Sequence, residues 1–399
     1  MNKKINCLIS FLIVLTVMLC ISCYVFASGQ TENPPIKIGA AVSLTGSFSR
    51  SGMDQKMGYE LWQEKINESG GLLGRKVELV IYDDRSEPMT GARLYEKLIT
   101  DDKVDLLLGP YGSSVTAAVS TTTEKYKMVL IAPGASSKEI WERGYKYVFQ
   151  MMTPARYQLR PAIVLAKSYG YNNIALVNAD SAFNKDSATG VIASIEELGL
   201  NLVIHEEYPL EAKDLSSLVL KVKSAEPDVV VAICYLPDSM LFTRQAKDAN
   251  LTPKMFQFGA QGPCVPDFID NLGEDANGLM GISQWQPGVK YTGSQEFIDS
   301  FNQKFPEVKV SYSIAAAYSA CELLKMAVEN AQSFDQEDLR EAILALDVVT
   351  PFGRFKVDPE GFQIGHDVVL IQIQDGEAFI VWPKEIAEKE VILPFQGWN

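Results

Sequence analysis

The sequence predicts an α/β protein with doubly wound parallel sheets, and two observations support this fold class. Apolar strand segments alternate with helical segments along most of the chain. Two of these strands, 104–108 and 129–132, break into tight loops rich in glycine and hydroxyl side chains, 109–114 and 133–137. The carboxyl ends of neighbouring parallel strands face one crevice, where helix N-termini present unpaired N–H groups and positive dipole ends. The two loops therefore predict an anion site of the kind that holds a carboxylate.

The first half of the alternation begins with a strand at 36–44. A Gly/Ser loop at 46–52 follows, and apolar positions then recur at helical spacing over 53–67, before a glycine-rich helix end at 70–74. The remaining elements of this half are a strand at 77–82, a helix at 90–100, a strand at 104–108, a helix at 115–125 and a strand at 129–132. This β-α-β-α-β-α order is typical of a parallel sheet.

After an extended segment at 147–154 the alternation starts again, so we expect a second lobe of the same type. Its elements are a helix at 158–169, a strand at 173–177, a helix at 185–198, a strand at 201–207, a helix at 215–225 and a strand at 229–234. Further along are a helix at 239–249, a strand at 255–258, a loop at 259–266, a strand at 278–284, and helices at 293–305, 311–329 and 336–345. Two last strands, 368–374 and 378–382, flank Asp375-Gly376 and predict a β-hairpin.

Length and charge narrow the classes of function. A chain of 399 residues exceeds what one hydrophobic core usually organises, so two domains are expected. The net charge is −14 and becomes −16 if Lys3 and Lys4 are removed with a leader. Such a negative chain is a poor partner for nucleic acid or an anionic membrane surface.

The N-terminus has the layout of a secretory signal. Lys3 and Lys4 precede an apolar stretch without charge, 5–27, so we expect an exported protein with a signal at 1–27 and a linker at 28–34. Cleavage after Ala27 and lipidation at Cys23 both stay open, and the stretch is also long enough to remain as a membrane anchor. Lipidation would anchor the protein at the cell membrane, whereas cleavage would release it into the periplasm.

The cysteines do not form a disulfide framework. Removal of the leader leaves only Cys234, Cys264 and Cys321, an odd and widely spaced set. We expect Cys234 and Cys321 to be core residues, and Cys264 to be accessible in its loop.

Several motifs, in order and at their spacing, resemble the type I periplasmic binding proteins of the leucine/isoleucine/valine-binding branch. The motifs are Ile36-Lys37-Ile38-Gly39, Leu44-Thr45-Gly46, Asn67-Glu68-Ser69-Gly70-Gly71-Leu72-Leu73-Gly74-Arg75, Tyr82-Asp83-Asp84 and the two loops described above. The likeness extends from about Pro35 to Trp382. It implies two Rossmann-like lobes with parallel sheets joined by three crossover strands, near 148–154, 281–286 and 352–357.

The resemblance also implies how the protein works. The N-terminal lobe would combine 35–150 with 285–352, and the C-terminal lobe 151–284 with 353–399. A small ligand, a branched-chain or related amino acid, would be caught between the lobes by hinge closure. The closed form would then deliver it to an ABC transporter permease in the inner membrane. We accordingly expect a monomeric binding protein without cofactor or enzymatic activity.

The same resemblance implies the site residues. In the family's amino-acid binders, hydroxyl and backbone groups of two successive loops hold the ligand carboxylate, which maps to Ser113 and Ser136, and the Gly134 carbonyl faces the ammonium. Ser51 lies at the entrance position. The full implied set is Ser51, Tyr111, Ser113, Gly134, Ala135, Ser136, Phe183, Tyr235 and Gln261.

Two departures from the family pattern bear on the ligand. Gln261 stands where the branched-chain binder has an acidic residue, and a neutral amide cannot give a charge-assisted bond to an ammonium. Ser86 and Gly112 occupy the positions of that protein's disulfide. Carboxylate recognition is therefore better supported than ammonium recognition, and an aromatic acid or an amide stays open as the ligand.

Simpler interpretations exist for most of these residues. Ser113 and Ser136 are also good helix N-caps, and Phe183 and Tyr235 would suit a lobe core. Carboxylates at a strand end, here Asp83, Asp84 and Glu87, more often cap the following loop than bind metal.

Other functions are less well supported by the sequence. His205 and His366 have no companion for a catalytic or zinc site, and neither a G-x-G-x-x-G motif nor a P-loop lysine is present. An α/β enzyme remains an alternative, because fold alone does not fix function. A sensor module that binds an aromatic acid or amide and signals through a separate receptor is the other alternative.

Overall fold

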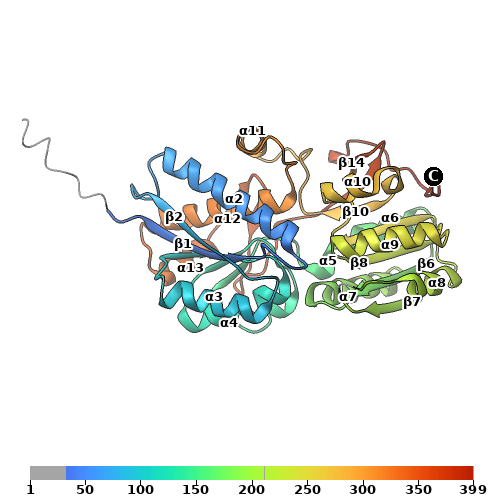
Figure 1. Cartoon of the computed structure of the whole chain (residues 1–399), viewed down its shortest axis with the longest axis horizontal. Coiled ribbons are helices and arrows are strands. Elements are labelled where there is room, and N and C mark those ends of the chain that lie inside the picture. The colour runs from blue at the N-terminus through green and yellow to red at the C-terminus, as the bar shows by residue number, and fades with distance from the viewer. Residues whose placement is uncertain (1–32, 211, 399) are drawn as a thin grey trace, which may run out of the picture. The chain divides into compact units, whose positions relative to one another are not determined.

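The computed structural model describes residues 33–398 except 211, and within them two separate sheets are covered by helices (Figure 1). The predicted signal and residues 28–32 of the predicted linker lie outside the described residues. In the described part of the chain, every helix is too short or too polar to cross a membrane.

The first sheet has five parallel strands in the order β2-β1-β3-β4-β5. The strands are β1 (Ile36–Val42), β2 (Val77–Asp83), β3 (Leu106–Leu108), β4 (Leu130–Ala132) and β5 (Val148–Gln150). The helices are α2 (Ser49–Glu68), α3 (Pro88–Thr100), α4 (Ser113–Tyr126), α11 (Ser294–Lys304), α12 (Tyr312–Ala331) and α13 (Gln336–Leu344). We call this sheet with its helices the first lobe.

Helices α2 and α12 lie side by side in the first lobe, although they are far apart in the sequence (Figure 1). Gly58 allows this approach, because a Cβ at this position would lie 2.7 Å from the carbonyl oxygen of Ile314. The start of α12 is thereby carried to the carboxyl ends of the strands, next to the loop that follows β3.

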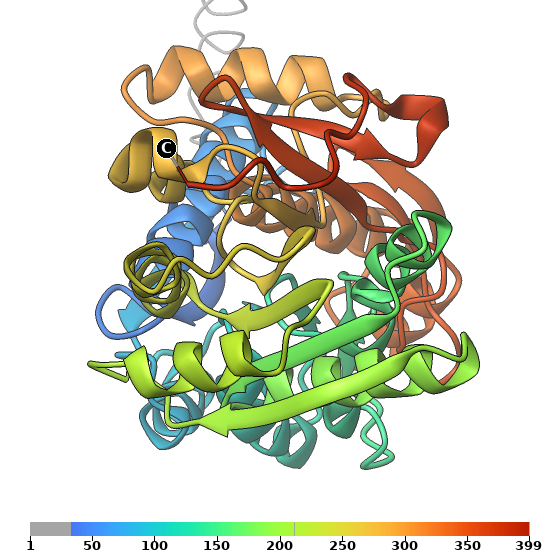
Figure 2. The ribbon, with the colours of Figure 1, turned by 90° about the vertical axis from the view of Figure 1, so that its right-hand side faces the viewer.

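The second sheet has seven strands in the order β14-β13-β10-β9-β8-β6-β7 (Figure 2). Its strands are β6 (Asn173–Ala179), β7 (Asn201–Tyr208), β8 (Val229–Cys234), β9 (Met255–Ala260), β10 (Met280–Ser283), β13 (Val369–Gln374) and β14 (Glu377–Trp382). Its helices are α5 (Ala155–Gln158), α6 (Arg160–Ser168), α7 (Ala182–Glu197), α8 (Ser216–Ser224), α9 (Leu236–Asp248) and α10 (Pro266–Leu272). We call this sheet with its helices the second lobe.

The strands β6 to β10 of the second sheet are parallel, whereas β13 and β14 add an antiparallel edge. The interior strand β8 is buried at every position, as expected for a strand covered on both faces. The predicted α/β fold class with parallel sheets is confirmed.

The chain passes between the lobes in segments that hydrogen-bond to one another. The backbone N–H of Gln150 at the end of β5 donates to the Gly361 carbonyl at 2.9 Å. Thr153, on the same connection, bonds to the other two connections. Its backbone N–H donates to Gln284 Oε1 at 3.1 Å, and its hydroxyl donates to the His366 carbonyl at 2.9 Å. These bonds tie the three connections together at one place, which is where a hinge would have to act.

Several predicted element boundaries are wrong. Helix α2 begins at Ser49, inside the segment predicted as a loop, because Gly52 packs onto the end of β1, where a Cβ would lie 1.9 Å from the Ser43 carbonyl oxygen. Helix α10 and strand β11 (Asp347–Thr350) were not predicted, and β11 pairs with β12 (Gly353–Lys356). The β13–β14 hairpin is confirmed, with positive φ at Asp375 and Gly376.

Candidate functional site

The loops 109–114 and 133–137 border a cavity lined from both lobes, with an empty space of about 390 Å³ that includes the part open to solvent. Six residues of the predicted set line it, namely Tyr111, Ser113, Gly134, Ser136, Phe183 and Tyr235. The other lining residues were not predicted from the sequence; they are Met152, Gln158, Ala260, Cys264, Ile282, Ser283, Gln284 and Tyr312. The structure therefore brings most of the predicted residues together, and adds a wall from the connecting segments and from α12.

Ser113 joins the two loops. It is the first residue of α4, and its Oγ accepts the backbone N–H groups of Ser136 and Ser137, both at 3.1 Å. The alternative that Ser113 is an N-cap is wrong, because the N-cap position of α4 is occupied by Gly112. Since Ser113 Oγ already accepts two bonds, its own O–H, for which the described residues offer no acceptor, is available to a ligand in the cavity.

Ser136 is arranged in a similar way. Its Oγ accepts the Gln158 side-chain amide at 3.0 Å, and the same amide nitrogen donates to the Thr153 carbonyl at 2.7 Å. Ser136 therefore does not cap a helix either, since the short 3₁₀ turn after it is preceded by Ser137. Two buried hydroxyl donors and the N-terminus of α4 thus face one cavity, an arrangement suited to carboxylate oxygens.

The Gly134 carbonyl, expected to face an ammonium, accepts the backbone N–H of Gly112 at 2.9 Å. This bond extends the pairing of the two loops, because Tyr111 and Gly134 form a parallel bridge beyond the ends of β3 and β4. The close pairing requires glycine, since a Cβ at position 134 would lie 2.8 Å from Tyr111 Cδ2.

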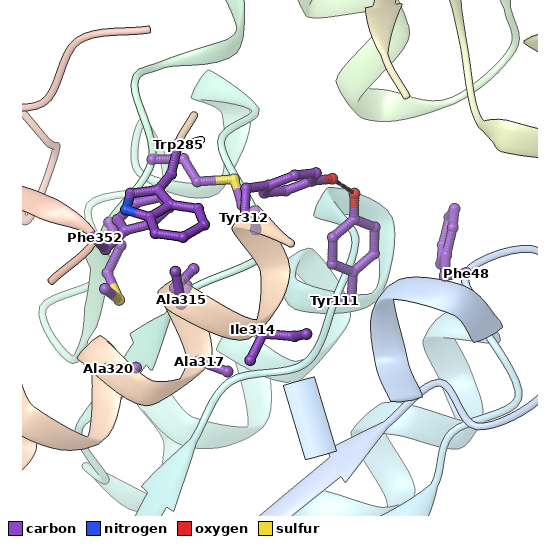
Figure 3. Close-up of a cluster of buried hydrophobic side chains, with 14 of the residues drawn as sticks. Phe48, Tyr111, Trp285, Tyr312, Ile314, Ala315, Ala317, Ala320 and Phe352 are labelled. Atoms are coloured by element: carbon purple, nitrogen blue, oxygen red, sulfur yellow. Dashed lines mark hydrogen bonds between the residues drawn. The ribbon is translucent and has the colours of Figure 1, made fainter. Parts of the chain in front are cut away.

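Aromatic rings form much of the remaining wall. The Phe183 and Tyr235 rings lie 6.4 Å apart between centroids, and Phe48 packs against Tyr235 at 4.8 Å. The Tyr111 and Tyr312 hydroxyls are hydrogen-bonded at 2.6 Å (Figure 3). Burial raises the pKa of Tyr111 well above its ordinary value and that of Tyr312 to about 12, so both rings stay neutral.

Ser51, Ala135 and Gln261 do not line the cavity, in contrast to the rest of the predicted set. The Gln261 side-chain nitrogen donates to Ser51 Oγ at 2.6 Å and to the Tyr111 hydroxyl at 3.1 Å, while its oxygen accepts the Leu236 N–H at 3.0 Å. Gln261 and Ser51 therefore lie behind the wall, where they connect the lobes and hold Tyr111. Ala135 is buried within the loop.

The lining carries no formal charge, because it holds no Asp, Glu, Lys, Arg or His among the described residues. A ligand carboxylate would meet neutral donors and a helix dipole, and an ammonium would meet only neutral oxygens and rings. This makes the cavity a better match for an organic acid than for a cation.

The carboxylates considered as metal ligands, Asp83, Asp84 and Glu87, accept hydrogen bonds from neighbouring groups. Asp83 accepts the Leu44 N–H at 2.9 Å, and Asp84 accepts the Ser43 hydroxyl at 2.6 Å, as expected for carboxylates that cap a loop. Glu87 accepts the Thr90 hydroxyl at 2.8 Å. Within the part of the chain that the structure describes, no cluster of metal-ligating side chains is found.

The cysteines and histidines are accounted for as well. Cys234 and Cys321 are buried, as predicted, but the prediction of an accessible Cys264 is wrong, because this residue is buried in the wall of the cavity. His205 Nε2 lies 2.8 Å from Asn178 Oδ1, and the buried ring of His366 stacks on Phe352 with centroids 4.6 Å apart.

The two-lobed α/β fold has a small cavity between the carboxyl ends of two sheets, an arrangement suited to holding a small solute. Comparison with known proteins gives the family. A family model described as periplasmic binding protein matches residues 35–378, so the chain belongs to the periplasmic binding proteins. This is a family of non-enzymatic binding proteins that act outside the cytoplasm.

Individual relatives and structures are similar over almost their whole length. Leu/Ile/Val-binding protein homolog 7 of Brucella suis biovar 1 (strain 1330) is 28% identical over 387 residues, which cover 92% of this chain and 96% of the relative. The branched-chain amino acid transporter substrate binding protein LivJ from Streptococcus pneumoniae, in complex with isoleucine, has a TM-score of 0.80 at 22% identity and covers 90% of this chain and 100% of its own. An ABC transporter solute binding protein from R. palustris, in complex with benzoate, has a TM-score of 0.78 at 20% identity. The match covers 91% of this chain and 97% of that protein.

Proposed function

We propose that this protein captures a small organic acid between its two lobes by hinge closure and delivers it to an ABC transporter permease. The proposal rests on two buried hydroxyl donors, Ser113 at the N-terminus of α4 and Ser136 in the loop after β4, which face one cavity lined from both lobes. Closure then selects the state in which both lobes contact the ligand. The LivJ structure, a branched-chain amino acid transporter substrate binding protein, supports a role in transport.

We further propose the lobes as first expected, 35–150 with 285–352, and 151–284 with 353–399. The two sheets divide in this way, and the boundary at 352/353 falls between β11 and β12, within a strand pair next to the hinge. The residues proposed to touch the ligand are Tyr111, Ser113, Gly134, Ser136, Phe183 and Tyr235. Ser51, Ala135 and Gln261 are proposed to support this wall from behind.

A branched-chain or related amino acid is the first candidate ligand, as in the isoleucine complex of LivJ. An aromatic acid is the second candidate, and the uncharged lining with its Tyr111, Phe183, Tyr235 and Tyr312 rings favours it. The benzoate complex of the R. palustris protein is consistent with that candidate. The two differ in the ammonium group, for which the described lining offers no carboxylate partner.

Isothermal titration calorimetry with L-isoleucine, L-leucine, benzoate and benzamide separates these candidates. Binding of either amino acid supports the first, binding of benzoate alone supports the second, and preference for benzamide over benzoate contradicts carboxylate recognition. A separate measurement, the intact mass of protein from the membrane fraction, distinguishes lipidation at Cys23 from cleavage after Ala27. Size-exclusion chromatography with light scattering tests the expected monomer.

A further inference from the structure

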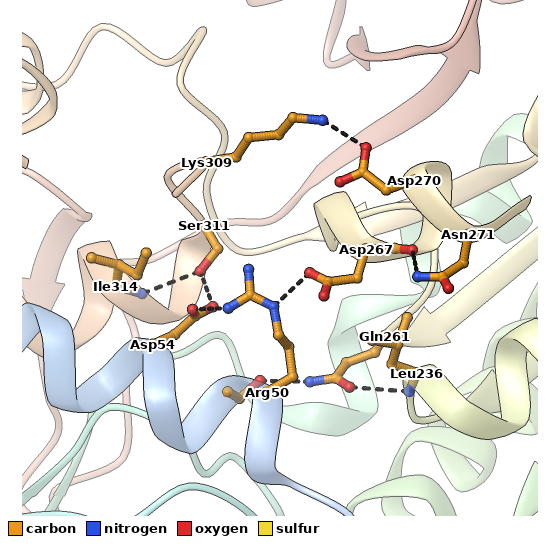
Figure 4. Close-up of polar contacts among 11 residues, drawn as sticks. Arg50, Asp54, Leu236, Gln261, Asp267, Asp270, Asn271, Lys309, Ser311 and Ile314 are labelled. Carbon is orange, nitrogen blue, oxygen red and sulfur yellow. Dashed lines mark hydrogen bonds and ion pairs between the residues drawn. The ribbon is translucent and has the colours of Figure 1, made fainter. Parts of the chain in front are cut away.

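The N-terminus of α2 meets α10 across the boundary between the lobes (Figure 4). Arg50 Nε donates to Asp267 Oδ2 at 2.5 Å, although the two residues are 217 positions apart. The Arg50 guanidinium also pairs with Asp54, one turn further along α2. Arg50 therefore lies between a carboxylate of its own helix and a carboxylate of the other lobe.

The Arg50–Asp54 ion pair within α2 orients the Arg50 guanidinium toward the other lobe. Asp54 is almost fully buried, and its second oxygen accepts the Ser311 hydroxyl at 2.5 Å. Burial raises the pKa of Asp54 to about 6, and the Arg50 charge and the Ser311 hydroxyl oppose this rise. Because Arg50, Asp54 and Ser311 all belong to the first lobe, their contacts are independent of how the lobes are placed. The bond to Asp267 depends on closure.

The ion pair is adjacent to the ligand cavity but is not part of it. Ser51, next to Arg50, accepts the bond from Gln261, and Gln261 also holds Tyr111, which lines the cavity. Neither Arg50 nor Asp267 is among the described lining residues. The Arg50–Asp267 ion pair and the Gln261–Ser51 hydrogen bond therefore join the two lobes at neighbouring positions of α2.

We propose that the Arg50–Asp267 pair is a positioning device that raises ligand affinity by stabilising the closed form, without touching the ligand. This inference rests on the proposed capture of a ligand by closure. A ligand that binds only the closed form has an apparent affinity proportional to the population of that form before binding. The pair is partly shielded from solvent, with side chains 20% and 37% exposed, so its loss should weaken binding about fivefold.

The test uses Asp267→Asn, with Asp267→Glu as the conservative variant that keeps the charge. The matched control is Glu197→Gln, which breaks an exposed ion pair with Arg160 inside the second lobe. Small-angle X-ray scattering of the ligand-free protein reports opening as a larger radius of gyration. We expect Asp267→Asn to be more open than wild type, and Asp267→Glu and Glu197→Gln to resemble wild type. The exposed Lys309–Asp270 pair also joins the two lobes at this boundary, and salt screens it in both proteins, so about 1 M NaCl should open the wild type more than Asp267→Asn.

Binding of L-isoleucine and benzoate is measured for the same variants, together with Arg50→Gln and the double variant Arg50→Gln/Asp267→Asn. In the Arg50→Gln background, Asp267→Asn should have no further effect on affinity or on opening. An Asp267→Asn protein as closed as wild type, or one that binds the probes equally well, overturns the proposal. If neither probe binds any variant, the proposed ligand class fails, and the scattering data alone decide on the ion pair.

Discussion

Replacement of Ser113 by alanine is expected to affect both stability and binding, for separate physical reasons. Ser113 Oγ is the acceptor for the N–H groups of Ser136 and Ser137, which belong to residues almost fully buried. An unpaired buried donor costs about 1–3 kcal/mol, and water that enters the cavity will offset part of this. We therefore expect Ser113→Ala to lower the free energy of unfolding by about 2–4 kcal/mol while the protein still folds.

Ser136→Ala provides the comparison. It leaves one N–H of the buried Gln158 amide without an acceptor while the other keeps its bond to the Thr153 carbonyl, so the stability loss should be about half that of Ser113→Ala, about 1–2 kcal/mol. Both variants remove a hydroxyl donor from the cavity and should weaken binding of a carboxylate by about tenfold or more. Ser120→Ala is the matched control, because Ser120 is a buried serine of the same helix that bonds only within α4.

Urea unfolding and calorimetry measure the two effects separately. The reasoning predicts that Ser113→Ala unfolds at distinctly lower urea than Ser136→Ala, and that Ser120→Ala binds like wild type. Equal unfolding midpoints for Ser113→Ala and Ser136→Ala would refute the bridging role of Ser113. Unchanged affinity in both cavity variants would refute the site assignment.

Three further predictions concern stability. Burial lowers the pKa of His366 to about 4, below the value of about 6.5 in the unfolded chain, so its contribution to stability is complete above pH 6.5 and is lost as the pH falls towards 4. The urea midpoint of wild type should accordingly fall more steeply over this range than that of His366→Asn, and parallel curves would contradict the assignment. A Cβ at Gly190 would lie 1.8 Å from the Arg156 carbonyl oxygen, so Gly190→Ala should force α7 away from α5 and lower the free energy of unfolding by at least about 2 kcal/mol, seen as a lower Tm. Tyr312→Phe removes the hydroxyl that is hydrogen-bonded to the Tyr111 hydroxyl, which still accepts a bond from the Gln261 amide. The free energy of unfolding in urea should therefore fall by only about 1 kcal/mol, and a clearly larger loss would contradict this.

The alternation of strands and helices was predictable because each element carries its own periodicity. Strand β8 is a continuous apolar run, and the hairpin turn at Asp375-Gly376 has residues that accept positive φ, so local chemistry alone located both. The start of α2 was missed because Gly52 normally indicates a loop. Here glycine is required by the close approach of Ser43, a contact between segments that no local pattern shows. Helix α10, with seven residues, is too short to show helical periodicity.

The site was predictable where it depends on strand order, and not where it depends on packing between distant segments. The loops with Ser113 and Ser136 follow neighbouring strands, so their meeting follows from the sheet. Tyr312 reaches the cavity only because α12 packs on α2, and Gln158 only because the chain crosses between lobes beside Ser136. Gln261 was placed in the correct loop, but its side-chain amide donates to Ser51 and Tyr111 and does not line the cavity.

If the cavity recognises a carboxylate through neutral donors, a free acid must bind better than its neutral counterpart. Calorimetry with L-isoleucine against its methyl ester, and with benzoate against benzamide, measures this difference. We expect at least one free acid to bind, and its neutral counterpart to bind at least about tenfold more weakly. Equal binding of acid and neutral counterpart, or no binding of any free acid, would contradict carboxylate recognition.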